Sequence, residues 1–385
     1  MLWSTVQADQ FCTLVTDGTH DSPKPQQSGW KLITSKHLKG HYIDFDSANW
    51  IGEADYLKVI SRSAVEQWDI LFSMIGTIGN IYLEKNPHVE YACKNMGIFK
   101  FSGNKENALW MYYYLKSPQA KAYIQTHLRG STQSYVPLGS LRDMPVPVPP
   151  QSVRNEIIAI LSPIDEKIEC NNAINDNLAG LLQTIYQERF SNDILAVNQG
   201  VLSDICSYSR DKVAVSELNV STYFSTENML SGKAGSTEAT SLPTTSQTTA
   251  CHKGDTLISN IRPYFKKIVY CEGNCGCSTD VLCFTPSQPR YSTYLFSTLY
   301  ADKFFAFMVA GSKGTKMPRG DKQQIMTYPV VLPSEEELAR FNTIASPLLE
   351  QIYSNRAENK RLSILRDTLL PKLMSGEIDV SAVQL

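Results

Sequence analysis

Apolar side chains recur in steps of four and three residues along two long stretches, one in the middle of the chain and one near its end. The first stripe consists of Ile157, Leu161, Ile164, Ile168, Asn171, Asn175, Leu178, Leu182 and Ile185. The second consists of Phe341, Ala345, Leu348, Ile352, Asn355, Asn359, Leu362, Arg366 and Leu369. This spacing keeps one stripe of a helix facing a partner helix. The pattern therefore predicts two long helices that pair as a coiled coil.

Each stripe becomes polar at the same place, where it carries two asparagines. Buried asparagine weakens a coiled coil but fixes its register and orientation. If the helices run antiparallel, the middle of one meets the middle of the other, and Asn171 and Asn175 can pair with Asn355 and Asn359. In the alternative arrangement Ile174 carries the stripe, and the asparagines are exposed.

The two helices belong to a longer internal repeat. At a shift of 184 residues, the first copy contributes Pro145, Val146, Pro149, Ser162, Pro163, Glu166, Ile168, Asn171, Asn175 and Leu178. They return as Pro329, Val330, Pro333, Ser346, Pro347, Glu350, Ile352, Asn355, Asn359 and Leu362. The pattern Asp69-x-Leu-x-Ser-x-Ile75 also returns as Asp255-x-Leu-x-Ser-x-Ile261. Two copies of one unit predict a pseudo-symmetric molecule that contacts two similar targets a fixed distance apart.

Outside the long helices the pattern is that of short strands and loops. Apolar runs between glycines and polar residues predict strands at Val59–Ile60, Ile70–Phe72 and within 78–83. Residues 107–128 have helical periodicity. The proline-rich run 144–150 imposes an extended backbone and ends the first globular unit. Residues 231–249 are rich in Ser, Thr and Gly and predict a mobile loop.

The ends of the long helices also have recognisable signals. Ser334 and Glu337 form a capping box at the start of the second helix, and Gly376 is a natural stop. Pro163 and Pro347 lie about two turns inside the helices. Either each helix bends there, or it restarts with the preceding serine as its cap; the sequence after Ser346 does not fit a capping box, which favours a bend.

Composition adds limits rather than a function. The chain has 385 residues, a net charge of −2 and an isoelectric point near 6.3, which is not the signature of a nucleic-acid binder. Positive charge is nevertheless concentrated locally, in residues 311–322 and around Arg262, Lys266 and Lys267. The sequence contains no long apolar run and no secretory signal at its start, so we expect a cytoplasmic protein that does not contact a membrane.

The cysteines raise the question of a metal site. Four of the nine cysteines lie close together, namely Cys271, Cys275, Cys277 and Cys283. Their spacing lacks the paired C-x2-C arrangement of structural zinc sites. We expect buried, reduced thiols and no metal, with a zinc site as the alternative.

Several short motifs follow one another in a characteristic order. They are Thr16-Asp-Gly-Thr-His20 with Ser22-Pro23, the run Gly29–Leu38 with Ile43–Phe45, Trp68–Ser73 with Ile75–Gly79, and Leu369–Ile378 at the end of the second helix. In this order, and with a long helix after each globular unit, they resemble the DNA-specificity subunit of type I restriction–modification systems. The resemblance covers nearly the whole chain.

The resemblance implies an α+β fold with two target recognition domains in a pseudo-twofold tandem repeat, each followed by a long helix. The two helices form an antiparallel coiled coil. The implied boundaries are 1–150 and 192–333 for the two recognition domains, and 151–191 and 334–378 for the two spacer helices. The second domain lacks the Asp-Gly-Thr-His motif, so we expect its half of the target to differ from the first.

The same resemblance implies the partners. They are double-stranded DNA, two methyltransferase subunits, and restriction and translocase subunits that join through the complex. S-adenosylmethionine and ATP are then expected on partner subunits, with no cofactor on this chain. A helix from Ser152 to Phe190 would be about 58 Å long. Heads at opposite ends of it would lie about one to two turns of B-DNA apart.

Phosphate contacts supply affinity for DNA and contacts with base edges supply specificity. In the first domain we expect these from the polar turn 129–135 and from residues near it: His20, Lys36, Thr77, Arg129, Ser131, Gln133 and Tyr135. In the second we expect them from Arg262, Tyr264, Lys266, Lys313, Lys316 and Arg319. Arginine and glutamine side chains can present the paired donors that purine recognition requires.

No enzymatic motif accompanies these residues. The sequence lacks an Asn-Pro-Pro-Tyr methyltransferase motif, a Gly-x-Gly-x-x-Gly fingerprint and a Gly-x-Ser-x-Gly nucleophile motif, so we expect no catalytic residues. Two alternatives stay open. One is a DNA-modifying enzyme with an unrecognised site, which methyl transfer by the purified chain would favour. The other is a scaffold that joins proteins and shows no binding to duplex DNA.

The matched asparagines lead to a first prediction. Asn171→Leu with Asn355→Leu should make the coiled coil more stable but allow alternative registers, because an apolar stripe specifies its alignment less strictly than a polar layer. The readout is the preferred gap between the two halves of the DNA target. A gap preference as sharp as that of the unchanged protein would contradict the prediction.

Overall fold

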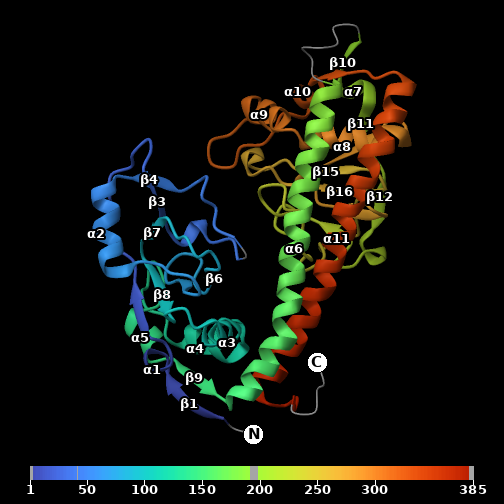
Figure 1. Ribbon diagram of the computed structural model, residues 1–385. Coiled ribbons are helices and arrows are strands. Elements are labelled where there is room, and N and C mark those ends of the chain that lie inside the picture. Colours follow the sequence, from blue (N-terminus) through green and yellow to red (C-terminus); the bar gives the residue numbers. More distant parts are fainter. Residues whose placement is uncertain (1–2, 41, 191–197, 381–385) are drawn as a thin grey trace. The chain divides into compact units, whose positions relative to one another are not determined.

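The computed structural model describes residues 3–40, 42–190 and 198–380, which form two compact units (Figure 1). Unit 1 consists of Met1–Cys170 with Asn359–Leu385, and unit 2 of Asn171–Glu358. Neither unit ends where a long helix ends, so each contains part of both. The expected boundary between residues 191 and 192 lies outside the described residues.

Unit 1 is built on three small sheets. An antiparallel sheet has the order β2 (Leu14–Asp17), β8 (Met96–Lys100), β5 (Ile70–Ser73) and β6 (Ile81–Leu83). A mixed sheet has the order β4 (Asn49–Ile51), β3 (Trp30–Ile33) and β7 (Tyr91–Cys93), in which β3 and β7 are parallel. The third pairs β1 (Ser4–Gln7) with β9 (Pro145–Val148), so the proline-rich run is an edge strand. The predicted strand at Ile70–Phe72 is confirmed.

The helices of unit 1 correct two expectations. Val59 and Ile60 lie in helix α2 (Glu53–Ser63), so the strand predicted there is wrong. Residues 107–128 are two helices, α3 (Lys105–Lys116) and α4 (Pro118–Thr126), and not one. The Ser117 side chain accepts from Ala120 N and caps α4, while Pro118 occupies its first turn, where a missing N–H costs nothing. The remaining short helices are α1 (Ala8–Phe11), the 3-10 turn η1 (Ser35–His37) and α5 (Leu138–Arg142).

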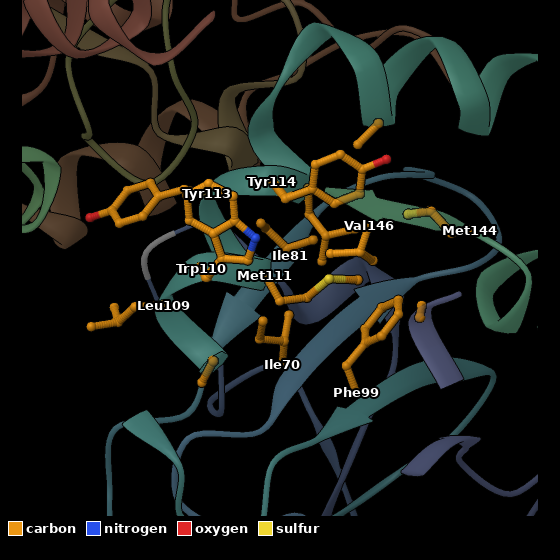
Figure 2. Packing of buried hydrophobic residues seen from close by; sticks show 14 of the residues in the cluster. Ile70, Ile81, Phe99, Leu109, Trp110, Met111, Tyr113, Tyr114, Met144 and Val146 are labelled. Carbon is orange, nitrogen blue, oxygen red and sulfur yellow. The ribbon is translucent and has the colours of Figure 1, made fainter. Parts of the chain in front are cut away.

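The core of unit 1 lies between the antiparallel sheet and α3. Figure 2 shows Trp110 and Met111 of α3 packed among Ile70 of β5, Ile81 of β6 and Phe99 of β8, all of them buried. Residues of both long helices join the same cluster: Ile157, Ile158 and Leu161, together with Leu370, Leu373 and Met374. The core therefore requires segments from both ends of the chain.

Unit 2 repeats the antiparallel sheet of unit 1 and alters the mixed one. Its antiparallel sheet has the order β11 (Cys206–Tyr208), β18 (Val281–Pro286), β15 (Thr256–Ser259) and β16 (Ile268–Tyr270). Its mixed sheet has the order β12 (Lys212–Ala214), β14 (Gln247–Cys251), β17 (Cys275–Cys277) and β13 (Tyr223–Phe224). A third pair joins β10 (Gln199–Val201) to β19 (Pro329–Val331).

Short helices complete unit 2. They are α7 (Leu202–Ile205), α8 (Ser292–Tyr300), α9 (Asp302–Ala310), α10 (Lys322–Met326) and the 3-10 turns η2 (Val215–Glu217), η3 (Pro263–Phe265) and η4 (Pro289–Tyr291). The polar segment expected to be a loop from 231 to 249 is one only as far as residue 246, because its last residues belong to β14.

A hydrogen bond between a helix and a strand occurs at the same place in both units, partly buried in unit 1 and buried in unit 2. Trp110 Nε1 of α3 donates to the Pro147 carbonyl of β9 at 2.8 Å. In unit 2, Tyr294 of α8 donates from its hydroxyl to the Val331 carbonyl of β19 at 2.5 Å. Both partners are related by the shift of 184 residues. Each bond joins a helix, α3 or α8, to the strand that precedes a long helix, β9 or β19.

The two long helices are α6 (Gln151–Phe190) and α11 (Glu335–Ser375), and both continue through their internal prolines. The alternative in which each helix restarts at its Ser-Pro pair is wrong. Ser162 Oγ donates to the Ile158 carbonyl at 2.6 Å, which is a contact inside a helix and not a cap. The capping box of Ser334 and Glu337 is confirmed, and α11 ends before Gly376, whose φ is 72°.

Within unit 1 the paired parts of α6 and α11 run antiparallel and enclose a cluster of charges. Asp165 accepts hydrogen bonds from Arg366 Nη1 at 2.7 Å and from Lys116 Nζ of α3 at 3.2 Å. Burial acts to raise the pKa of Asp165, but Lys116 and Arg366 together hold it below its usual value. Burial also lowers the pKa of Lys116. This network links α3 to both long helices.

Within unit 2 the paired parts of the helices, side by side in Figure 1, meet at the predicted polar layer. Asn355 Nδ2 donates to Asn175 Oδ1 at 2.9 Å, and Asn171 Nδ2 donates to Glu358 Oε2 at 2.8 Å. Asn171, Asn175 and Asn355 are buried, whereas Ile174 is 40% exposed. The asparagines therefore lie in the stripe, and the alternative that places Ile174 there is wrong.

The remaining members of both stripes are buried or half-buried, including Arg366.

No helix in the described ranges is long and apolar enough to cross a membrane.

The charge network of unit 1 gives a second prediction. Asp165→Asn should reduce the free energy of unfolding by about 3 kcal/mol, because it leaves two cations without their shared buried partner. Since folding lowers the pKa of Asp165, its contribution is present at neutral pH and is lost as the pH falls through the folded-state value. Urea unfolding at several pH values measures both effects.

The matched control is Asp367→Asn. Asp367 also contacts Arg366, at 2.8 Å, but its side chain is 64% exposed. The expected loss is below about 1 kcal/mol. Equal destabilisation by the two substitutions would show that the buried network has no special role.

Candidate nucleic-acid interface

The polar turn 129–135 of unit 1 is a closed hairpin tip. Arg129 N donates to the Tyr135 carbonyl and Tyr135 N donates to the Arg129 carbonyl, each at 2.9 Å. Gly130 has a φ of 90°, and a Cβ there would lie 2.3 Å from the Gln133 carbonyl oxygen, so only glycine fits. Ser131 and Gln133 are exposed at the tip. The loop is thus held at its base while its polar side chains face solvent.

Unit 2 builds the same hairpin from different residues. Lys313 N donates to the Arg319 carbonyl at 2.9 Å and Arg319 N donates to the Lys313 carbonyl at 3.0 Å. Each loop also forms a β-bridge to the residue two positions after the central strand, β5 or β15. Tyr135 is bridged to Ile75 in unit 1, and Arg319 is bridged to Ile261 in unit 2. The predicted residues of each loop therefore come together at the end of β5 or β15.

The turn after this central strand lies beside the hairpin loop. We call the hairpin loop and this turn together the edge of each unit. In unit 1 it contains Gly76 and Gly79, with φ values of 80° and 87°. In unit 2 the turn is the 3-10 turn η3, flanked by Arg262 and Lys266 in the left-handed region, with φ values of 51° and 50°. A side chain in this region costs about 1–2 kcal/mol relative to ordinary backbone. Unit 2 therefore keeps two basic side chains where unit 1 uses glycine.

Arg262 and the loop of unit 2 are joined directly. Arg262 N donates to the Pro318 carbonyl at 2.8 Å. Beside it, Tyr264 and Phe265 are 50% and 39% exposed, with ring centroids 4.8 Å apart. Exposed aromatic rings among basic groups are the surface that stacks on bases or covers sugars.

Lys266 makes an ion pair at the same edge. Its Nζ lies 2.9 Å from Asp302 Oδ1, which also accepts from Lys233 at 2.7 Å. Hydrogen bonds from the two lysines lower the pKa of Asp302. One carboxylate therefore serves two cations, which leaves a net positive charge.

The other predicted residues of unit 1 lie beside its turn. Thr77 Oγ1 donates to the Ser35 carbonyl at 3.4 Å, which places the exposed Lys36 of η1 next to the turn. The His20 ring lies 2.8 Å from Asp17 Oδ2 and 2.8 Å from Asn95 Oδ1. Asn95 immediately precedes β8, whose first residue pairs with Ser73 of β5. His20 is thus held at the same end of the sheet.

Sequence reasoning missed the residues that orient these groups. Asp17 accepts from both His20 and Arg62 in unit 1, and Asp280 accepts from Arg319 in unit 2. Asn95 and Asp280 each precede the last strand of the antiparallel sheet, β8 or β18. If the two copies are aligned strand by strand, Asn95 and Asp280 occupy the same position. This correspondence is the signal from which these orienting residues could have been found.

The two edges differ in their number of basic side chains, although three of those in unit 2, Lys266, Lys313 and Arg319, are paired with carboxylates. The predicted residues of unit 2 include five cations, namely Arg262, Lys266, Lys313, Lys316 and Arg319. Those of unit 1 include Lys36, Arg129 and the titratable His20. The hairpin loops of the two units form the same bridges, but unit 2 has more basic side chains that could contact a negatively charged ligand.

A polar pocket of about 360 Å³ opens beside the edge of unit 2. Its lining comes mainly from the polar segment 225–243 and includes Tyr223 and Asp280. Asn228 holds this segment in place, because its Nδ2 donates to the Tyr223 carbonyl at 2.9 Å and to the Thr237 carbonyl at 3.0 Å.

The cysteine cluster of unit 2 lies in a buried core. Cys251, Cys271, Cys275, Cys277 and Cys283 are all buried, and Sγ of Cys275 lies 3.5 Å from Sγ of Cys271. None of the nine cysteines is in a disulfide. Within residues 3–40, 42–190 and 198–380, no group of three or more His, Cys, Asp or Glu side chains is arranged to hold a metal ion.

This chain is similar to proteins of type I restriction–modification systems. Residues 3–179 match the model of the type I restriction modification DNA specificity domain. The MjaIX specificity subunit of a type I restriction enzyme from Methanocaldococcus jannaschii is 22% identical, over 90% of this chain and 86% of that protein. The HindI specificity subunit from Haemophilus influenzae is 23% identical over 40% of this chain and 35% of that protein.

A solved structure has the same fold. The S subunit of a type I restriction–modification system from M. genitalium superposes with a TM-score of 0.55 at 16% identity, covering 96% of each chain. Residues 3–179 therefore form a type I restriction modification DNA specificity domain, and a specificity subunit of such a system is similar to this chain along nearly its whole length.

Proposed function

We propose that this chain reads a two-part DNA sequence for a type I restriction–modification complex. Residues 1–150 and 192–333 are the two recognition domains, and residues 151–191 and 334–378 are the spacer helices that set the gap between half-sites. The observation that carries the proposal is the duplicated edge, in which each unit presents the same hairpin and turn with different side chains. A shared frame with different groups is what two unlike half-sites require.

The residues at each edge support a division of labour. Basic side chains such as Lys36, Lys316 and Lys266 are suited to phosphates, which supply affinity that falls with added salt. Side chains with paired donors, such as Gln133 and Arg319, are suited to base edges in the major groove. We assign DNA contacts to the predicted set His20, Lys36, Thr77, Arg129, Ser131, Gln133, Tyr135, Arg262, Tyr264, Lys266, Lys313, Lys316 and Arg319.

The partners of the chain are part of the same proposal. Two methyltransferase subunits bind it, and restriction subunits join through the complex; S-adenosylmethionine and ATP bind to these partners. Both long helices have exposed apolar residues, which favours a protein partner: Ile174, Leu181, Ile344, Ile364 and Leu365. The complex acts on DNA in the cytoplasm.

The test is single-molecule methylation sequencing of DNA from cells that express this chain with its methyltransferase subunit. We expect methylation at a motif made of two short half-sites separated by a fixed gap. Replacing residues 200–333 with those of another specificity subunit should change one half-site and leave the other intact. A complex that forms but methylates no motif would contradict the proposal, and motifs altered in both halves would contradict one domain per half-site.

The strained turn of unit 2 gives a separate prediction. Arg262→Gly should leave the stability unchanged or raise it by up to about 1 kcal/mol, because glycine adopts the left-handed region without strain. The same substitution should weaken DNA binding and reduce the slope of log affinity against log salt by about 1, since one phosphate contact is lost.

Ser102→Gly is the control for this prediction. Ser102 also has a left-handed backbone, with a φ of 49°, but it lies in the turn before α3 of unit 1. It should gain stability in the same way and bind DNA with an unchanged salt slope. Unchanged DNA binding by Arg262→Gly would remove Arg262 from the interface.

A further inference from the structure

The guanidinium of Arg319 is held by a carboxylate at the edge of unit 2. Its Nη2 lies 3.0 Å and its Nε 3.3 Å from Asp280 Oδ1. Both side chains stay accessible, with 52% of Arg319 and 39% of Asp280 exposed. An exposed ion pair of this kind contributes little to stability. Its consequence is the orientation of the arginine.

The backbone around this pair is fixed on both sides. Asn260 N donates to the Asp280 carbonyl at 2.8 Å, and the Asn260 carbonyl accepts from Gly320 N at 3.3 Å. Asp280 and the residue after Arg319 are thus both hydrogen-bonded to the backbone of Asn260. Arg319 is also held by its two backbone bonds to Lys313. The ion pair therefore spans a rigid frame and not a loose loop.

The contact with Asp280 uses only one side of the guanidinium. Arginine has five N–H donors in a planar fork, and the contact engages Nε and Nη2. The edge formed by Nη1 and the second hydrogen of Nη2 is left with two parallel donors. Parallel donors match the O6 and N7 acceptors of guanine in the major groove, whereas adenine presents a donor in place of O6.

We propose that Arg319 reads a guanine in the half-site recognised by unit 2, and that Asp280 is its positioning residue. The inference rests on the proposed function and makes it more specific, because it names a base. A carboxylate that fixes the fork before DNA arrives reduces the rotamer freedom lost on binding. It also directs the fork toward one base edge and away from phosphates.

The matching place in unit 1 predicts a different preference. Tyr135 stands where unit 2 has Arg319, and Asn95 stands where it has Asp280. Asn95 contacts His20. Unit 1 therefore has no arginine fork at this position, and the guanine read by Arg319 has no counterpart at the equivalent position of the other half-site.

The first experiment compares methylation motifs for the unchanged chain and for Arg319→Gln, each co-expressed with the methyltransferase subunit. The unchanged chain should require a G·C pair at one position of one half-site. Glutamine pairs with the N6 and N7 atoms of adenine. Arg319→Gln should therefore relax that position or shift it to A·T and leave every other position intact. Arg290→Gln is the control, because Arg290 forms a comparably exposed ion pair, 2.7 Å from Glu335; its motif should not change.

The second experiment measures binding by the purified complex to duplexes with 7-deazaguanine at that position, which lack the N7 acceptor. The unchanged complex should lose about 10-fold in affinity relative to guanine. Arg319→Gln should not distinguish the two duplexes. Asp280→Asn should reduce the discrimination, and should have no further effect when combined with Arg319→Gln, which a merely structural role would not predict.

Three outcomes would overturn the inference. The first is a methylation motif unchanged by Arg319→Gln. The second is an unchanged complex that is insensitive to 7-deazaguanine at every guanine of that half-site. The third is an affinity loss in Arg319→Gln that is equal for all sequences, which would make Arg319 a phosphate contact. If the unchanged chain forms the complex but directs no two-part methylation, the proposed function itself fails. That result is distinct from any of the three.

Discussion

The antiparallel packing of α6 against α11 is the constraint on which both globular units depend. Each unit takes part of its core from both helices, as Leu161 and Leu373 do in unit 1 and Leu182 and Phe341 do in unit 2. Unit 1 also joins residues near the start of the chain to residues near its end. Contacts over such sequence distances are costly in loop entropy. The position of each edge loop therefore depends on the register of the two helices.

That register is specified by polar groups that differ between the units. Unit 2 has the hydrogen bond between Asn175 and Asn355, and unit 1 has the pair of Asp165 and Arg366. At a shift of 184 residues, the positions of Asp165 and Arg366 are occupied in unit 2 by Leu349 and Leu182. A buried ion pair is seldom more stable than a well-packed apolar pair, but removing one partner is strongly destabilising. If α6 paired with α6 of a second copy, Leu182 would stand opposite Asp165. The charge asymmetry therefore favours pairing within one chain.

The sequence predicted the long helices and the internal repeat better than it predicted the short helices and strands. A mainly apolar stripe of nine positions in each helix is a long signal, and the repeat shows that it occurs twice. By contrast, the strand predicted at Val59 and Ile60 rested on two apolar residues alone. Together with Tyr56 they have the i, i+3, i+4 spacing of an amphipathic helix, which is what α2 forms. The break at Ser117–Pro118 was readable from capping rules but was hidden by continuous apolar periodicity on both sides.

For the candidate site, the same contrast holds at the level of single residues. The hairpins at 129–135 and 313–319 were recognisable from glycine and charge. Their bridges to Ile75 and Ile261, and the pairing of Asp280 with Arg319, join segments that lie tens of residues apart. Such contacts depend on the order of strands in the sheet, which apolar alternation alone does not fix. The sequence therefore brought out the polar and basic groups of each loop but not the carboxylates that hydrogen-bond with them.

The comparison of the two turns shows how one frame can serve two targets. The backbone must enter the left-handed region after β5 and after β15, because the loop from the following helices pairs with the chain at that point. Unit 1 meets this requirement with Gly76 and Gly79, which adopt it without strain, and it presents little side chain there. Unit 2 meets it with Arg262 and Lys266 and accepts the strain. The two turns also differ in backbone, because seven residues separate β5 from β6 and eight residues, including η3, separate β15 from β16. The two units therefore share the bridges to their hairpin loops and differ in both the backbone and the side chains of the turn.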